Sequence, residues 1–174
     1  IQVNMGSPNV LSKIPSYANT TNVKISNNSF YYTVDIDDHS EAWTFSYSPI
    51  MLGNFHCVVF SDNCYSHQKK IKDLLYSLYQ DMPNISYILN LNNFINKDDE
   101  IIKLKVDERG SGWTKSCGSG ATATASFVIR YSYINEIMID EVLIEQEGGQ
   151  LKIQWKDYNG KSANDIYLFG PTTF

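Results

Sequence analysis

One segment constrains the fold more than any other: a Gly-rich turn, a cysteine and an Ala-rich run follow one another within residues 108–133. Residues 100–106, before the turn, alternate apolar and polar side chains, which predicts a half-buried strand. Residues 121–133 contain no Gly or Pro, which predicts a buried helix. Cys117 therefore lies at a strand-to-helix junction, and a Gly-Ser-Gly sequence forms the start of the helix.

A helix N-terminus favours negative charge, because its first N–H groups have no partner inside the helix and the helix dipole is positive there. The same field is expected to lower the pKa of the Cys117 thiol from roughly 8.5 toward neutrality. A thiolate available near neutral pH is a usable base, so the segment indicates proton-transfer chemistry. The competing interpretation is that Cys117 is a small buried apolar residue and that the glycines only form a tight turn.

Residues 108–121, Glu-Arg-Gly-Ser-Gly-Trp-Thr-Lys-Ser-Cys-Gly-Ser-Gly-Ala, closely resemble the second active-site block of bacterial diaminopimelate epimerases. Other segments, in the same order as in that family, are similar to its V-x-M-G-x-P, M-G-N-P-H-C-V, N-I-G-F, P-G-G-x-L-x-I-x-W and Y-x-x-G-P motifs. These segments are residues 3–8, 52–58, 83–85, 148–155 and 167–171. The chain departs from the family at Phe55, where Pro is usual, at Ser86, where Gly is usual, and in a shorter stretch before Asn84.

The resemblance assigns catalytic roles to three side chains. Cys117 is expected to exchange a proton with the α-carbon of an amino acid, Glu108 to assist this proton transfer, and His56 to lie beside the thiols. Local sequence alone supports other interpretations: His56 as a structural core histidine, and Glu108 as half of a surface ion pair worth roughly 0 to 1 kcal/mol.

The resemblance also predicts substrate-binding groups. Arg109 suits a substrate carboxylate, because its planar guanidinium can donate two parallel hydrogen bonds. The N–H groups of Gly118 and Ser119 are expected to face the α-carboxylate, and Asn54 and Asn84 to bind the distal amino-acid end. On sequence grounds alone the two asparagines would be ordinary turn residues.

The resemblance covers one half of a two-domain enzyme. Members of the family have two similar domains that each contribute a cysteine, and the first C-G-N-G block is absent here. Cys57 and Cys64 precede no Gly-rich helix start. We therefore expect residues 1–174 to form a single domain equivalent to the C-terminal half, without the N-terminal half and the final returning strand. Such a chain is expected to be inactive alone and to need the missing N-terminal domain as a partner; a homodimer remains open.

The implied fold class is α+β, with a mixed, mostly antiparallel sheet curled around a central helix and with one surface helix. Apolar residues at helical spacing place the surface helix at residues 66–80. Runs of aromatic and β-branched residues predict the strands. The expected strands are residues 22–26, 29–35, 42–48, 56–61, 86–91, 101–106, 141–146, 150–155 and 165–169.

Composition excludes several classes of function. The net charge of -5, without a Lys/Arg patch, argues against a nucleic-acid partner. No apolar run approaches the roughly 18 residues of a membrane helix and no signal peptide opens the chain, so a cytoplasmic protein without membrane contact is expected. Cys57, Cys64 and His67 lack metal-ligand spacing, so no metal is expected. No pyridoxal-phosphate lysine context or dinucleotide fingerprint is present, so no cofactor is expected.

The sequence thus predicts a cofactor-independent isomerase that interconverts LL- and meso-diaminopimelate by proton transfer between two thiols, with this chain supplying one thiol. Three alternatives remain. A proline or hydroxyproline racemase would share the two-thiol logic but is expected to carry a D-R-S-P-C-G-T-G block. A phenazine-type isomerase of the same fold would lack Cys117. A lone domain that binds an amino acid or a partner subunit without turnover is the non-enzyme alternative.

Overall fold

The computed structural model describes residues 1–11, 22–156, 158–159 and 164–170. Within them, one 12-stranded sheet has the strand order β1-β12-β11-β10-β8-β7-β6-β5-β4-β3, with β2 paired to β5 and β9 to β8. The strands are β1 Gln2–Asn4, β2 Asn9–Val10, β3 Val23–Asn27, β4 Tyr32–Asp38, β5 Glu41–Leu52, β6 Asn54–Val59, β7 Asn84–Ile88, β8 Ile101–Glu108, β9 Gly112–Thr114, β10 Glu141–Gln146, β11 Gly149–Gln154 and β12 Tyr167–Phe169. The helices are the 3-10 helix η1 Cys64–His67, α1 Gln68–Leu78, α2 Leu91–Ile95 and α3 Gly118–Ile134.

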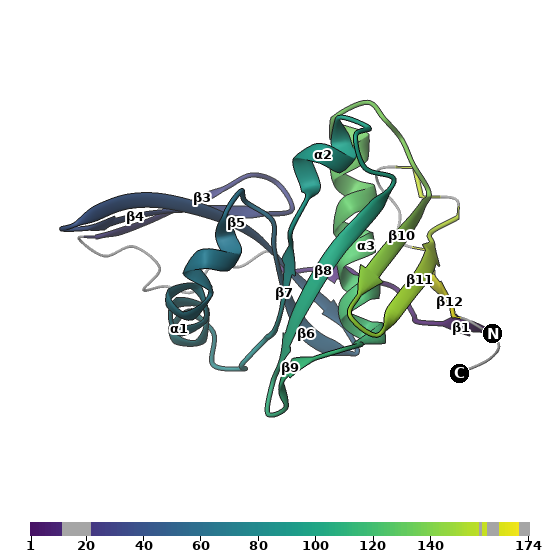
Figure 1. Ribbon diagram of the computed structural model, residues 1–174, viewed down its shortest axis with the longest axis horizontal. Helices are drawn as coiled ribbons and strands as arrows, with labels where there is room; N and C mark the ends of the chain where they lie inside the picture. The colour runs from purple at the N-terminus through teal and green to yellow at the C-terminus, as the bar shows by residue number, and fades with distance from the viewer. Residues whose placement is uncertain (12–21, 157, 160–163, 171–174) are drawn as a thin grey trace.

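The sheet curls around α3, which contacts strands from β5 on one side to β12 on the other (Figure 1). The pairs β6–β7 and β8–β10 are parallel, and the other strand pairs are antiparallel. The predicted α+β fold, a mixed and mostly antiparallel sheet around a central helix, is confirmed. Strands β3, β4 and β5 extend away from α3 as a long arm (Figure 1).

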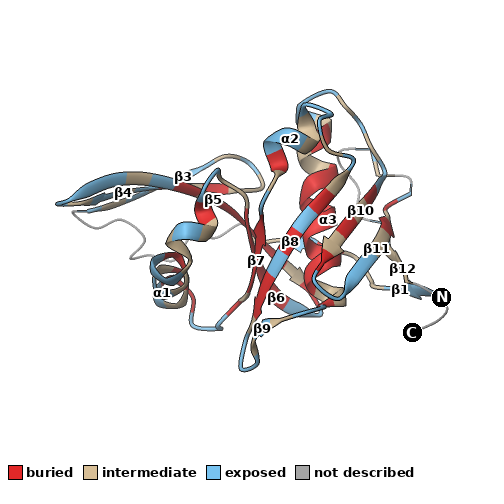
Figure 2. Cartoon of the chain, in the orientation of Figure 1, coloured by how far each residue is buried: buried red, intermediate tan, exposed pale blue. Residues whose placement is uncertain are grey.

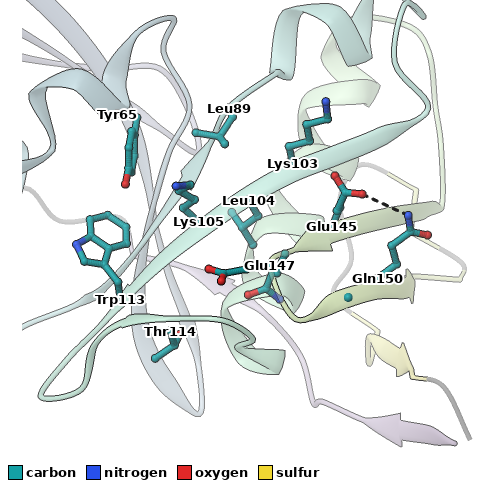
Figure 3. Close-up of a pocket in the computed structure, with 12 residues that line it drawn as sticks. Tyr65, Leu89, Lys103, Leu104, Lys105, Trp113, Thr114, Glu145, Glu147 and Gln150 are labelled. Atoms are coloured by element: carbon teal, nitrogen blue, oxygen red, sulfur yellow. Dashed lines mark hydrogen bonds between the residues drawn. The ribbon is translucent and has the colours of Figure 1, made fainter. Parts of the chain in front are cut away.

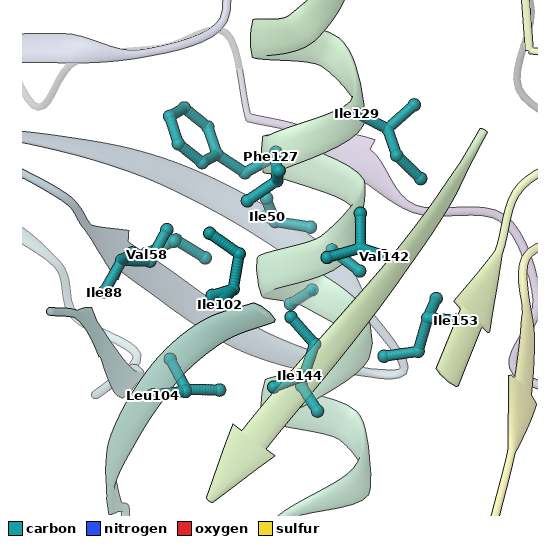
Figure 4. Close-up of a cluster of buried hydrophobic side chains, with 14 of the residues drawn as sticks. Ile50, Val58, Ile88, Ile102, Leu104, Phe127, Ile129, Val142, Ile144 and Ile153 are labelled. Carbon is teal, nitrogen blue, oxygen red and sulfur yellow. The ribbon is translucent and has the colours of Figure 1, made fainter. Parts of the chain in front are cut away.

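The first hydrophobic core surrounds α3, which is buried along most of its length (Figure 2). Its small residues Ala121, Ala123 and Ala125 let the strands approach closely, and aliphatic side chains of the sheet pack around the helix (Figure 4). The Phe127 ring is stacked on Phe60, with 4.3 Å between the ring centroids. Each large side chain buried in this way contributes roughly 1.5–3 kcal/mol to folding. The helix is therefore a fixed support for the residues at its N-terminal end.

A second core lies on the other face of β5, β6 and β7, under α1. Because side chains alternate along a strand, Phe55, Cys57 and Val59 of β6 belong to this second core, whereas Val58 belongs to the core around α3. The same alternation turns His56 toward α3. Strand β6 is therefore buried on both faces, which explains its nearly continuous apolar sequence.

The structure differs from the sequence-based boundaries in several places. Helix α3 begins at Gly118, as the Gly-Ser-Gly helix start predicts, whereas α1 begins only at Gln68, after a turn of 3-10 helix. The strand expected at residues 86–91 ends at Ile88, and α2 begins at Leu91. Strands β2 and β9 and helix α2 were not expected, because short elements leave almost no periodic pattern. Pro171, part of the last expected motif, lies outside the described residues.

Candidate active site around Cys117

Cys117 is the N-cap residue of α3, with an extended backbone (φ -138°, ψ 107°). Its sulfur accepts a hydrogen bond from the Gly120 N–H at 3.3 Å and lies 3.6 Å from the Ser119 hydroxyl oxygen. The thiol thus takes the place that a Ser or Asp side chain occupies at most helix N-termini. Its exposed fraction is 8%, so it is nearly buried and in contact with donors that stabilise negative charge.

The turn between β10 and β11 clamps the chain just before α3. The Gln146 side-chain amide accepts from the Cys117 N–H at 2.9 Å and donates to the Cys117 carbonyl at 3.3 Å. The Gly148 N–H donates to the Lys115 carbonyl at 2.7 Å. Sequence reasoning missed Gln146; the signal that could have found it is a polar residue on the buried face of an otherwise alternating strand.

Glu108, at the end of β8, sets the charge beside the thiol. The Thr114 hydroxyl donates to the Glu108 carboxylate at 3.0 Å, and this carboxylate lies close enough to Cys117 for its charge to act on the thiol. Burial raises the pKa of the Cys117 thiol, and the Glu108 carboxylate raises it further, whereas the Gly120 N–H and the Ser119 hydroxyl lower it.

The prediction of a lowered thiol pKa is therefore wrong for this chain. Desolvation of a buried thiolate and the nearby negative charge outweigh the favourable field at the N-terminus of α3. Near neutral pH, Cys117 is accordingly protonated. It is an acid that could give up a proton, rather than a thiolate that is already prepared to remove one.

His56 is completely buried, and within the described residues neither of its ring nitrogens has a hydrogen-bond partner. Burial lowers the pKa of His56 to about 4, although the Glu108 charge opposes this shift. The interpretation of His56 as a core histidine with satisfied hydrogen bonds does not fit this geometry. The structure places it as a neutral imidazole in the electrostatic range of Glu108.

Asn84 and Arg109 lie side by side, but their polar groups already have partners. The Asn84 side chain donates to the Phe55 carbonyl at 3.2 Å and accepts from the Arg109 N–H at 2.8 Å. The Arg109 guanidinium pairs with the Asp81 carboxylate at 2.5 Å, and both side chains are more than half exposed. In the described structure, Asn84 therefore links the start of β7 to β6 and to the residue after β8, and Arg109 is paired with Asp81.

The predicted site residues therefore fall into two groups. Cys117, Glu108, His56, Gly118 and Ser119 converge around the N-terminus of α3. Asn54, Asn84 and Arg109 instead line a shallow surface pocket of about 510 Å³, together with Phe55 and Asp81 among others. The two groups adjoin, because His56 is the register partner of Asn84 and Arg109 directly follows Glu108.

A larger pocket, of about 730 Å³, lies where β8 separates from the turn between β10 and β11 (Figure 3). Lys103, Lys105 and Trp113 line one side of it, and Glu145 and Gln150 the other. Cys117 does not line this pocket, but Gln146 does. This larger pocket is therefore not the candidate active site, although it shares Gln146 with the clamp that holds Cys117.

The remaining cysteines are structural in this arrangement. Burial raises the pKa of Cys57 well above its ordinary value, and that of Cys64 to about 12.

The His67 imidazole contacts the Glu41 carboxylate at 3.4 Å and is stacked on Trp43. Among the residues that the structure describes, no cluster of His, Cys, Asp and Glu could hold a metal ion.

No described helix combines the length and the apolar character needed to cross a membrane.

Residues 49–174 match the family model described as diaminopimelate epimerase. The chain is 24% identical to diaminopimelate epimerases from Methanococcus maripaludis strains C6 and C5, in each case over 143 residues that make up 80% of this chain and 47% of the relative. It thus spans about half the length of these curated relatives. A hydroxyproline epimerase from Agrobacterium vitis aligns with a TM-score of 0.47 and 12% identity, over 84% of this chain and 52% of that structure. Since the family model covers well over half of the sequence, the chain belongs to the diaminopimelate epimerase family.

Proposed function

We propose that this chain is the second half of a cofactor-independent amino-acid epimerase and that Cys117 is one of its two acid/base thiols. The observation that carries the proposal is the arrangement at the N-terminus of α3. A protonated thiol lies there between the Glu108 carboxylate, whose charge disfavours the thiolate, and donors that stabilise the thiolate, Gly120 and Ser119.

The proposed reaction transfers one proton out of the substrate and one proton in. A thiolate on the missing half removes the α-proton, and the electron pair of the broken C–H bond is delocalised into the α-carboxylate. The Cys117 thiol then delivers its proton to the opposite face of the α-carbon, which inverts the configuration and leaves Cys117 as a thiolate. The reverse direction exchanges the roles of the two thiols.

The α-carboxylate needs hydrogen-bond donors, because negative charge accumulates on it in the transition state. The N–H groups of Gly118 and Ser119 belong to the first turn of α3, where the helix offers them no internal acceptor. They lie beside the thiol that reacts at the neighbouring α-carbon. We assign them to the α-carboxylate for this reason.

The finer proposal is that the substrate is diaminopimelate, interconverted between its LL and meso forms. Asn54, Asn84 and Arg109 share one surface pocket next to Glu108 and would bind the distal amino-acid end. A substrate carboxylate would have to displace Asp81 from Arg109. Exposed ion pairs are worth only about 0 to 1 kcal/mol, so this exchange is accessible.

A reducing compartment such as the cytoplasm would keep Cys117 as a free thiol.

The proposal predicts that turnover needs both halves. We would incubate the purified chain, and separately the protein extended by a half that supplies the second thiol, with LL-diaminopimelate, trans-4-hydroxy-L-proline and L-proline. Chiral chromatography would separate the stereoisomers. We expect meso-diaminopimelate to form only with both halves present.

Other outcomes would redirect the proposal. Inversion of hydroxyproline or proline in place of diaminopimelate would favour a racemase of different specificity. Conversion by the chain alone would contradict the need for a second half. If the two-half protein inverts none of the three, the non-catalytic amino-acid-binding alternative is favoured.

A further inference from the structure

Ser86 has a buried hydroxyl whose hydrogen-bonding capacity is unused. It lies on β7, is 0% exposed, and its Oγ has no hydrogen-bond partner among the described residues. The strand alternation places it on the same face as Ile88, which packs in the core around α3. A buried hydroxyl without a partner costs folding free energy, so its presence calls for an explanation.

The geometry around Gly120 places this hydroxyl beside the thiol. A Cβ atom built on Gly120 would lie 3.3 Å from the Ser86 Oγ and 3.1 Å from the Cys117 Sγ. Both side chains therefore border the same small space, which stays open because residue 120 is a glycine. Ser86 also stands at the position where the resemblance in sequence leads us to expect glycine, so the hydroxyl is an addition to the usual motif.

The charged and polar groups around Cys117 show what an added donor would do. Glu108 from β8 disfavours the thiolate through its negative charge. His56 from β6 is neutral and lies in the range of Glu108. The donors from α3 are the Gly120 N–H and the Ser119 hydroxyl. A further donor on β7 would add to this stabilisation from a different element.

We propose that Ser86 is a positioning residue whose hydroxyl donates a hydrogen bond to the Cys117 sulfur once the thiol has lost its proton. While the sulfur is protonated, the hydroxyl has no partner. The ionised sulfur gains a donor that the protonated one does not use, so the contact favours the thiolate specifically. The role in turnover rests on the proposed function, whereas the effect on the thiol itself does not.

The test is the pH dependence of Cys117 alkylation by iodoacetamide, followed by mass spectrometry of the peptide that contains Cys117. Alkylation reports the thiolate, because the thiolate is the nucleophile. We expect the midpoint of the profile to rise by about 0.5 to 1 pH unit in Ser86→Ala and in Ser86→Gly, which slows the reaction at neutral pH by roughly three- to tenfold. The thermal midpoint should stay equal or rise in Ser86→Ala, because an unpaired buried hydroxyl is removed.

Thr124→Val is the matched control. Thr124 also has a buried hydroxyl with no partner among the described residues, but it lies seven residues beyond Cys117 along α3, roughly 10 Å away. Its alkylation profile should equal that of the unmodified protein. An unchanged midpoint in both Ser86 variants, or an equal shift in Thr124→Val, would overturn the inference.

The two proposals fail separately. A shifted alkylation midpoint in a two-half protein that inverts no amino acid would support the role of Ser86 and refute the epimerase function. Inversion of diaminopimelate with an unshifted midpoint would support the function and refute the role of Ser86.

Discussion

For single residues, the main result is that two opposing effects set the pKa of the Cys117 thiol: hydrogen-bond donors at the start of α3 lower it, and burial beside a carboxylate raises it. The Gly120 N–H and the Ser119 hydroxyl favour the thiolate, whereas desolvation and Glu108 favour the thiol, and the second pair prevails. A sequence motif reveals the glycines and the helix start. It does not reveal how deeply the sulfur is packed, which depends on strands β8 and β10 and on the turn that follows β10.

His56 carries a prediction about stability and pH. Its pKa in the folded protein, about 4, lies below the ordinary value of 6.5, so the unfolded chain binds a proton that the folded chain excludes. The stability contributed by a neutral His56 is complete above pH 6.5 and is lost as the pH falls toward 4. Between pH 7.5 and 4.5 this loss should amount to about 2–3 kcal/mol.

Urea denaturation of the unmodified protein and of His56→Leu at these two pH values measures the effect. We expect the variant to lose about 2–3 kcal/mol less than the unmodified protein on acidification. His67→Gln serves as the control, because it removes an imidazole from a partly exposed position. Equal acid sensitivity in His56→Leu and the unmodified protein would show that His56 is not held neutral by burial.

At the scale of elements, the turn between β10 and β11 fixes the start of α3. The Gln146 amide occupies both backbone polar groups of Cys117, and Gly148 approaches Lys115 so closely that no side chain fits between them. Two segments about thirty residues apart in sequence thus determine where the thiol lies. This clamp explains how a helix that begins with a Gly-Ser-Gly sequence has a defined first turn.

Gly148→Ala tests the clamp. The added Cβ would lie 3.0 Å from the Lys115 carbonyl oxygen and 3.1 Å from the Ser116 Cβ, so the loop or the turn must move. We expect a loss of about 1–3 kcal/mol in the free energy of unfolding, measured in urea. Gly118→Ala is the matched control: its Cβ would meet only Leu168 at an ordinary 3.5 Å, and the change should stay within about 0.5 kcal/mol. Similar stability of the two variants would argue against a close-packed clamp.

The elements also show what the sequence could and could not predict. The composition of the sequence predicts the strands near residues 101–106 and 141–146, which are rich in β-branched residues, and the helix after Cys117, which is rich in Ala and free of Pro. The hairpin that joins β8 to β9 was not predicted, because the motif at Glu108 was interpreted only as a catalytic block. Gly110 and Gly112 have positive φ angles of 82° and 72°, and they let this hairpin form. The hydrogen bonds of Gln146 and the position of Ser86 beside the thiol could not be predicted, because they depend on how distant segments pack together.

At the scale of the whole molecule, two hydrophobic cores share strands β5, β6 and β7. The core around α3 supports the thiol, and the core under α1 supports the far face of the same strands. His56 on β6 and Ser86 on β7 therefore lie on strands that are buried on both faces. The proposed acid/base site is therefore supported by strands that are buried on both faces.

The whole-molecule proposal adds a second half that carries the other thiol. The two diaminopimelate epimerases that match this chain are about twice as long as the matched region, which is consistent with a second half.

The most direct test of the central claim is deuterium incorporation at the α-carbon of LL-diaminopimelate in deuterated water, catalysed by the two-half protein. The comparison is between the unmodified protein, Cys117→Ser and Cys57→Ser, which alters a buried thiol in the second core. We predict that incorporation is retained in Cys57→Ser and is reduced by at least about a hundredfold in Cys117→Ser, since general acid–base groups contribute roughly 10²–10⁴-fold. Undiminished incorporation in a folded Cys117→Ser protein would contradict the assignment of Cys117 as a proton-transfer group.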